Sequence, residues 1–175
     1  AGEDGVAAYS IACYFFPIVF MFNGSIAQSA QPIISFNYGI NQHLRAFKAL
    51  KIALTTSLAF SVVSIVITFF VSSHISSIFL PPTAKAHAIA SQGLILYALC
   101  FIPFAINLIG ICYFQSIERS SVAMFLTILR GFVFLAIAFV TLSHYFGIEG
   151  TWSAVPVAET ATAIFTIFFM IYFYR

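Results

Sequence analysis

Residues 28–39 read Gln-Ser-Ala-Gln-Pro-Ile-Ile-Ser-Phe-Asn-Tyr-Gly and close a run in which no charge occurs between Asp4 and Arg45. The stretch is polar and contains Gln31 and Pro32, so it should weaken a helix. An unsatisfied backbone group in lipid is expensive, so a broken helix is tolerated only against protein or a water-filled cavity. The stretch therefore predicts an interrupted helix beside an aqueous pathway.

The composition around this stretch is that of a membrane protein. Hydrophobic residues make up 62% of the 175 residues and charged residues 7%, with a mean hydropathy of +1.05. An ordinary soluble domain carries about 25% charged residues, so this chain lacks the charge for a wetted surface. The three cysteines lie within apolar runs and show no metal-binding spacing. We predict an all-α fold, a polytopic bundle of membrane helices.

Five runs are apolar and long enough to cross a hydrocarbon core, which takes about 20 residues of helix. They lie at about residues 6–30, 52–71, 88–115, 121–142 and 151–174. A proline inside a helix removes a backbone hydrogen bond and bends the helix. We therefore expect flexing points, or hinges, at four prolines: Pro17, Pro32, Pro103 and Pro156.

The distribution of Lys and Arg predicts the orientation of these spans, because cytoplasmic loops carry an excess of positive charge. One side receives Arg45, Lys48, Lys51, Arg119, Arg130 and Arg175. The opposite side receives Lys85, together with the acids Glu3, Asp4 and Glu149. The N-terminus is then outside and the C-terminus in the cytoplasm. Five spans that start outside, in a chain without an initial Met, lead us to expect a segment of a longer protein.

The motifs of common enzyme classes are missing: H-E-x-x-H, G-x-S-x-G and the Walker A pattern do not occur. We therefore predict that the chain is not an enzyme. The four histidines stand at span ends or in loops, and no metal site is predicted. Prolines within spans and polar residues at membrane depth are typical of a transporter whose bundles rock about a hydrated interior. A channel would show a repeated filter motif or charged rings, and the sequence has neither.

Polar residues at membrane depth are the candidates for lining or gating a cavity: Gln31, Asn37, Asn107, Gln115, Arg130 and Glu159. Glu159 lies eight positions into the last span, about 12 Å along its axis. If it faces a cavity, a carboxyl group there can exchange a proton or hold a cation. The alternative is a carboxyl near the outer interface, paired with a hydroxyl or with the local backbone.

Three of the other candidates also have alternatives. Arg130 is interpreted as a side chain that snorkels to lipid phosphates. Otherwise it is a cavity-lining cation that interacts with Glu118 or Glu159. Asn107 and Gln115 are eight residues apart and nearly share a helix face. Their amides serve either helix–helix contacts or a hydrated cavity.

Three blocks of this sequence resemble a known family. They are residues 5–10, Gly-Val-Ala-Ala-Tyr-Ser; residues 31–39, from Gln-Pro to Asn-Tyr-Gly; and residues 146–159, Phe-Gly-Ile-Glu-Gly-Thr-Trp-Ser-Ala-Val-Pro-Val-Ala-Glu. These blocks and their spacing are similar to the C-terminal half of multidrug and toxic compound extrusion (MATE) transporters, in the bacterial drug-efflux branch. The resemblance covers essentially the whole chain.

The resemblance implies twelve spans in two six-helix bundles across a central cavity, with these five as spans eight to twelve. It implies an antiporter in the inner or plasma membrane of a bacterium, which exports organic cations and drugs in exchange for H⁺ or Na⁺ without a cofactor. Its partners would be the lipid bilayer, small organic cations and the missing N-terminal half, with no nucleic acid. The family's coupling acid lies in that missing half, so this chain is not expected to transport alone.

The resemblance also bears on the coupling ion and leaves two other functions open. Some members carry an acid on span ten for sodium, where this chain has Asn107, which argues against a sodium site in this lobe. A lipid-linked oligosaccharide flippase of the same superfamily would show a more cationic cavity, for which Arg130 is the only candidate. A non-transporting membrane scaffold would use its polar residues for packing alone.

Loop charge changes the interpretation of residues 28–39. The end of this stretch is predicted at the cytoplasmic face, beside Arg45 and Lys48. An inner gate or a hinge at the helix end is therefore favoured over a site that contacts drugs.

Overall fold

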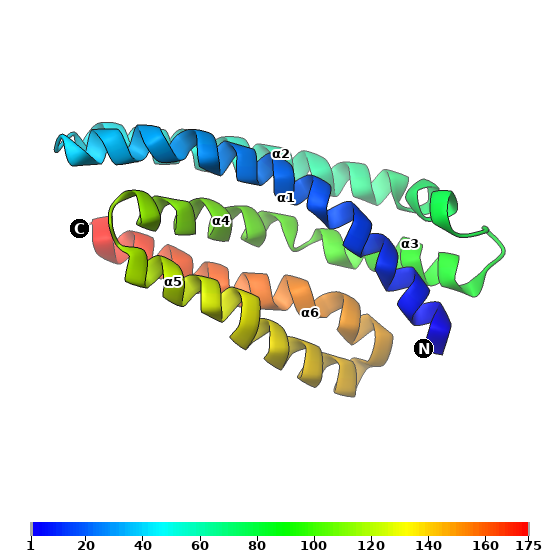
Figure 1. The fold of residues 1–175 in the computed structure, drawn as a ribbon. Coiled ribbons are helices and arrows are strands. Elements are labelled where there is room, and N and C mark those ends of the chain that lie inside the picture. The colour runs from blue at the N-terminus through cyan, green and yellow to red at the C-terminus, as the bar shows by residue number, and fades with distance from the viewer. Residues whose placement is uncertain (1, 175) are drawn as a thin grey trace.

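The computed structural model describes residues 2–174, and its regular structure is entirely helical (Figure 1). The elements are α1 (Gly2–Gly39), α2 (His43–Phe79), α3 (Lys85–Ala98), α4 (Phe101–Ser116), α5 (Ser120–Ile128), the π-helix η1 (Leu129–Val133) and α6 (Phe134–Tyr174). Large apolar side chains such as Phe70 and Phe132 are exposed on the helix surfaces, as expected of faces that lipid covers. The predicted all-α bundle is confirmed.

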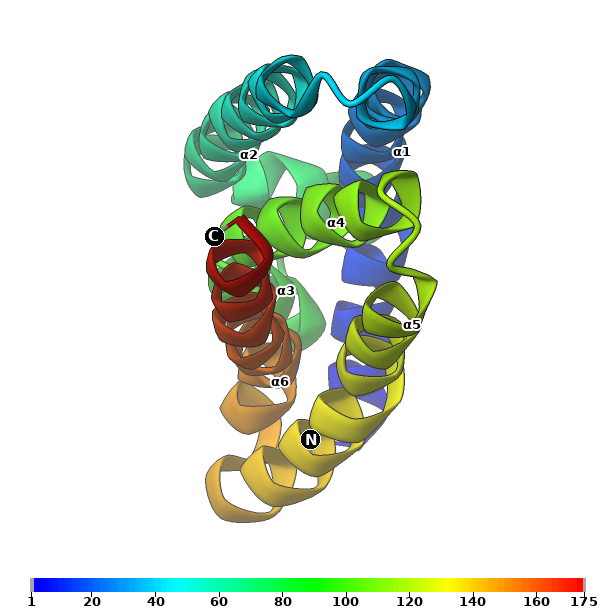
Figure 2. The ribbon, with the colours of Figure 1, turned by 90° about the vertical axis from the view of Figure 1, so that its left-hand side faces the viewer.

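The helices are layered, with α4 between the α1–α2 pair and the pair formed by α5 and α6 (Figures 1 and 2). The turn between α1 and α2, the turn between α4 and α5, and the C-terminus share one end of the bundle (Figure 1). The N-terminus and the connection between α2 and α3 lie at the other end. The long helices α1 and α2 therefore run from one end of the bundle to the other.

Three helical stretches are long and apolar enough to span a membrane: Gly2–Gly39, His43–Phe79 and Ser120–Phe173. The pair α3 and α4 makes a fourth candidate if the two are counted as one bent span. Ser120–Phe173 reverses direction at Gly147, so it supplies two arms of the bundle rather than one (Figure 2).

Residues 28–39 belong to an unbroken α1, so the predicted interruption there is wrong. Pro32 lies inside the helix, which continues for two further turns. Ile34 is only 1% exposed and packs in a core with Leu50 and Phe114. Burial of this apolar face offsets the loss of the single backbone hydrogen bond that Pro32 cannot make.

The chain leaves α1 only after Gly39. Asn41 adopts a left-handed φ of 59°, and the Gln42 N–H donates to the Asn37 carbonyl at 2.8 Å. Such a bond closes the end of a helix, because it satisfies one of the last free carbonyl groups. The turn between α1 and α2 therefore comes directly after residues 28–39 and not within them.

α2 begins at His43, well before the predicted span at residues 52–71. Three cations predicted in a loop lie instead on its first turns: Arg45, Lys48 and Lys51. The buried face of the helix is formed mainly by small side chains, including Ser57, Ser61, Ser64, Thr68, Ser72 and Ser76. Small hydroxyl residues let helices approach closely in lipid, and Ser57 Oγ donates to Asn23 Oδ1 of α1.

The predicted third span is bent by 43° where α3 meets α4. Leu99 and Cys100 separate the two helices, and Pro103 follows in the first turn of α4. Pro103 has no N–H to donate to the carbonyl of Leu99, and its ring crowds that carbonyl. The bend therefore has a local cause at a predicted hinge proline; that the bend flexes stays a prediction.

The reversal between the last two arms is sharp and depends on glycine. Gly147 has φ 58° and ψ −129°, a left-handed conformation that strains other residues. A Cβ at Gly150 would lie 1.9 Å from the Leu142 carbonyl oxygen, so the returning arm needs glycine there too. The predicted gap between the spans at residues 121–142 and 151–174 is thus too long, because the chain is helical on both sides of Gly147.

Candidate functional site

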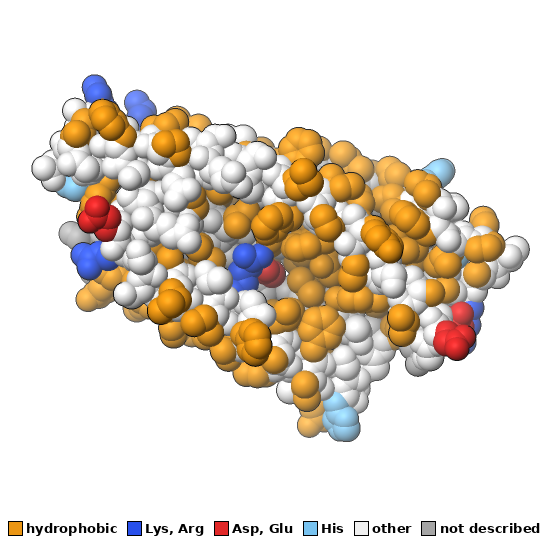
Figure 3. Space-filling model, in the orientation of Figure 1, with side chains coloured by type: hydrophobic (Ala, Val, Ile, Leu, Met, Phe, Trp, Pro, Cys, Tyr) orange, Lys and Arg blue, Asp and Glu red, His pale blue; other side chains and the backbone are white. Residues whose placement is uncertain are grey.

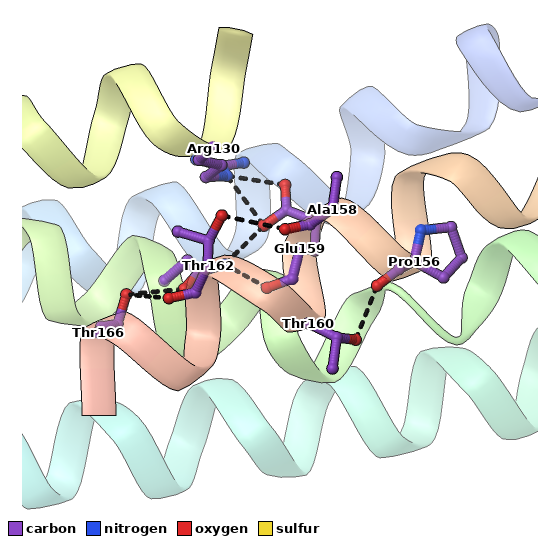
Figure 4. Close-up of polar contacts among 8 residues, drawn as sticks. Arg130, Pro156, Ala158, Glu159, Thr160, Thr162 and Thr166 are labelled. Atoms are coloured by element: carbon purple, nitrogen blue, oxygen red, sulfur yellow. Dashed lines mark hydrogen bonds and ion pairs between the residues drawn. The ribbon is translucent and has the colours of Figure 1, made fainter. Parts of the chain in front are cut away.

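An ion pair joins the two arms on either side of the reversal. Arg130 Nε lies 2.7 Å from Glu159 Oε1 and 2.9 Å from Oε2 (Figure 4). The side chains are only 18% and 8% exposed. The interpretation of Arg130 as a side chain that snorkels to lipid phosphates is therefore wrong. Of the two alternative partners, Glu118 and Glu159, Arg130 pairs with Glu159.

Asn107 of α4 completes the coordination of the carboxylate. Its Nδ2 donates to Glu159 Oε2 at 2.8 Å and to the Glu159 carbonyl at 2.9 Å. Its Oδ1 accepts from Thr166 Oγ1 at 2.8 Å, and Asn107 is fully buried. The donor and acceptor groups of three elements therefore form one network, whose charge is balanced within the fold.

Local helix geometry positions Arg130. It lies in η1, where a wider turn of π-helix interrupts the α-helical spacing, a feature frequent at functional sites. Its guanidinium carbon lies 4.6 Å from the centroid of the Phe104 ring. This cation–π contact stabilises a partly desolvated cation by about 0.5–2 kcal/mol. Phe104 and Asn107 are three residues apart on α4, so one helix face contacts both members of the pair.

A hollow of about 320 Å³ gives access to the pair. Helices α1, α3 and α6 contribute Phe16, Tyr97 and Val155 to its lining, which also includes both Arg130 and Glu159. Figure 3 shows basic and acidic atoms together in the middle of the face, with hydrophobic side chains beside them, while the other charged side chains lie toward the two ends. A cation with apolar groups would meet aromatic rings and a carboxylate there.

The structure does not bring the remaining predicted residues to this pair. Gln115 is exposed near the end of α4, although Asn107 on the same helix is fully buried. Eight residues turn a helix by about 80° beyond two full turns, which is enough to separate the two faces. Gln31 is half-buried on α1, and Asn37 Nδ2 donates to the Ile33 carbonyl of its own helix at 2.7 Å.

Two members of the network were missed at the level of sequence, Phe104 and Thr166. Thr166 follows Glu159 by seven residues with Thr162 between them, a helical spacing that puts polar side chains on one face. That spacing in an apolar helix was a usable signal. Phe104 gave no such signal, because nothing in the sequence distinguishes it from the other phenylalanines, of which the chain has 22 in all.

No group of three His, Cys, Asp or Glu side chains within residues 2–174 lies close enough to hold a metal ion.

The comparison with protein families decides what kind of protein this bundle comes from. The MatE family model matches residues 1–142. The chain belongs to the MatE family. This is a family of transporters and not of enzymes, in agreement with the missing enzyme motifs. That the chain is its C-terminal half, and of the bacterial branch, stays a prediction.

Solved structures of MATE transporters share this fold. An outward-facing multidrug resistance MATE transporter matches with a TM-score of 0.89 at 16% identity, over 97% of this chain and 38% of that one. An inward-facing one matches with 0.80 at 14% identity, over 93% and 37%. A crystal structure of a MATE mutant matches with 0.88 at 17% identity, over 97% and 38%. No curated protein sequence matches. The chain thus spans under two fifths of the length of these MatE-type structures.

Proposed function

We propose that this chain is part of the C-terminal lobe of an efflux antiporter, which exports organic cations or drugs in exchange for H⁺ or Na⁺. The observation that carries the proposal is the buried Arg130–Glu159 pair, held by Asn107 and open to a hollow at membrane depth. Within this lobe Glu159 is the ionisable group that meets a cation. The membership of the chain in the MatE family supports the transport class.

The energetics of the pair favour a function over simple packing. A charged side chain at the centre of a membrane helix costs about 2.5–3.5 kcal/mol on insertion scales. Replacing a buried ion pair by well-packed apolar residues is often neutral or stabilising. A scaffold would therefore gain nothing from Arg130 and Glu159, whereas a transporter needs groups that exchange partners.

The geometry suggests how that exchange works. Arg130 occupies the carboxylate of Glu159 in this conformation, and the hollow lies beside both. An organic cation or a coupling ion gains Glu159 only when the guanidinium leaves the carboxylate, and with it its present contact with the Phe104 ring. Rocking of the lobe against its partner half, about bends such as the one at Pro103, would move the two arms that carry the pair.

The balanced charge of Arg130 favours efflux over a lipid-linked oligosaccharide flippase. A flippase for an anionic pyrophosphate-linked substrate needs free cations in its cavity. Arg130 is neutralised by Glu159, and the hollow has no other Lys or Arg among the described residues that line it. The pair is thus better suited to a cationic substrate.

The proposed orientation has the C-terminus in the cytoplasm of a bacterium, with Gln31, Asn37 and Gln115 as gating groups near the inner face. The turn between α1 and α2, the turn between α4 and α5 and the C-terminus share one end of the bundle (Figure 1). The cations Arg45 and Arg119 border those turns, which supports the positive-inside assignment.

Drug efflux by cells that express the full-length protein tests the proposal. Glu159→Gln keeps the shape and removes the charge, and we expect it to reduce efflux roughly tenfold or more, the effect of losing about 1.4 kcal/mol of interaction. Glu149→Gln is the matched control, because the same substitution falls on an exposed residue at the reversal and should leave efflux unchanged. Normal efflux by Glu159→Gln at normal expression would refute the role of Glu159. A wild-type protein that exports no drug and binds no cation would support the scaffold or the flippase.

A further inference from the structure

A second hollow, of about 720 Å³, is lined by α1 and α2 and includes neither Arg130 nor Glu159. Its lining is apolar along most of its length, with Ile26 and Ile33 from α1 and Ile52 from α2. Alanines from both helices leave it open between these larger side chains. We call this feature the α1–α2 groove.

Positive charge gathers at one end of the α1–α2 groove. Arg45 and Lys48 both contribute to its lining, are three residues apart on α2, and are exposed. No acid lines the groove, and within residues 2–174 the only ion pair is the one between Arg130 and Glu159. The two cations are therefore available to a negatively charged ligand.

The length of the groove matches one leaflet of a bilayer. Arg45 and Thr56 mark the ends of its lining on α2, and eleven residues of helix span about 16 Å. The hydrocarbon core is about 30 Å thick, so one leaflet contributes about half of that. A cationic end over an apolar trough of this length is complementary to a phosphate headgroup over an acyl chain.

We propose that the α1–α2 groove binds one anionic phospholipid. Its phosphate lies between the Arg45 guanidinium and the Lys48 ammonium group, and an acyl chain packs along Ile33 and Ile52. Asn37 Nδ2 has a second N–H beyond the one that the Ile33 carbonyl accepts, so it can donate to the headgroup. The bound lipid would fix the start of α2 to the end of α1, where the chain makes its tight turn.

Native mass spectrometry of the purified full-length protein tests this site with added phosphatidylglycerol or phosphatidylcholine. We expect the wild-type protein to retain phosphatidylglycerol preferentially. Arg45→Ala with Lys48→Ala should lower that preference roughly tenfold or more, since each basic residue near an anionic headgroup contributes separately. Added inorganic phosphate should not displace the lipid, because the groove also holds the chain.

The matched control is Lys51→Ala with Lys85→Ala, which removes the same two charges from exposed residues outside the groove. This variant should keep the preference for phosphatidylglycerol. If both double variants lose this preference equally, net charge alone explains the loss, and the proposed site is overturned. The thermal transition of Arg45→Ala with Lys48→Ala shows whether this variant is folded. If the folded variant keeps the full preference for phosphatidylglycerol, another part of the protein covers the groove. That outcome would overturn the site as well. The efflux assay with Glu159→Gln is independent of these outcomes.

Discussion

Two polar regions of this bundle differ in how their side chains are satisfied. Residues 28–39 of α1 include amides and hydroxyls, yet Asn37 bonds within its own helix and much of the stretch is exposed. Glu159 of α6 has a partner 29 residues before it and another 52 before it in sequence, on different elements. We therefore expect polar residues of this bundle to be costly to change where they are bonded across helices, and tolerant of change where they are not.

The largest effect on stability is expected from Arg130→Ala, which leaves the charge of Glu159 buried without its cationic partner. Removal of one member of a buried pair destabilises a protein by about 3–5 kcal/mol. We expect a loss of that size in unfolding of the purified protein in detergent. The double variant Arg130→Met with Glu159→Met should recover most of the loss. A double variant as unstable as Arg130→Ala would mean that the pair itself stabilises the fold.

A smaller effect is expected from Asn107→Ala. This variant removes the donor to Glu159 Oε2 and the acceptor for Thr166 Oγ1. The lost bond to the carboxylate contributes about 1.5–3 kcal/mol, as hydrogen bonds to charged groups do, although Glu159 Oε2 keeps Arg130 Nε and Thr166 keeps the Thr162 carbonyl as partners. Gln115→Ala on the same helix is the control and should stay within about 0.5 kcal/mol, because Gln115 is exposed. Equal effects of the two would contradict the network.

The smallest effect should come from Asn37→Ala in the first region. Among residues 2–174 its side-chain amide bonds the Ile33 carbonyl of the same helix and no group on another helix, so we expect a change in unfolding free energy within about 0.5 kcal/mol. The same unfolding measurement in detergent checks it. A loss as large as that of Asn107→Ala would show that residues 28–39 have a partner across helices, and would strengthen their proposed role as a gate.

The sequence predicted the fold class well and the ends of the helices poorly. Long apolar runs identify membrane helices because lipid offers no other partner to backbone groups. The break predicted at Pro32 was wrong, because burial of Ile34 on one face of α1 outweighs the single backbone hydrogen bond that Pro32 cannot make. The sequence left eight residues between the last two predicted spans, whereas Gly147 makes a single sharp reversal there.

The sequence identified most of the polar residues of the candidate site but not their contacts with one another. Glu159, Arg130 and Asn107 stood out as polar residues at membrane depth. Their mutual contacts did not, since Glu118 was as good a partner for Arg130 by charge and lies closer to it in sequence. Gln115 was grouped with Asn107 by helical spacing, but the offset of about 80° over eight residues places it on the exposed side of α4.

By itself, the sequence determined that the chain is a bundle of membrane helices, and its motifs resemble the MATE family. Hydropathy suffices for this, because an apolar run long enough to cross the bilayer can satisfy its backbone groups within itself as a helix. Only the tertiary structure decided that Arg130 neutralises Glu159, with Asn107 on the same carboxylate. That pairing depends on the reversal at Gly147 and on how α4 packs against α6, and neither is a local property of the chain.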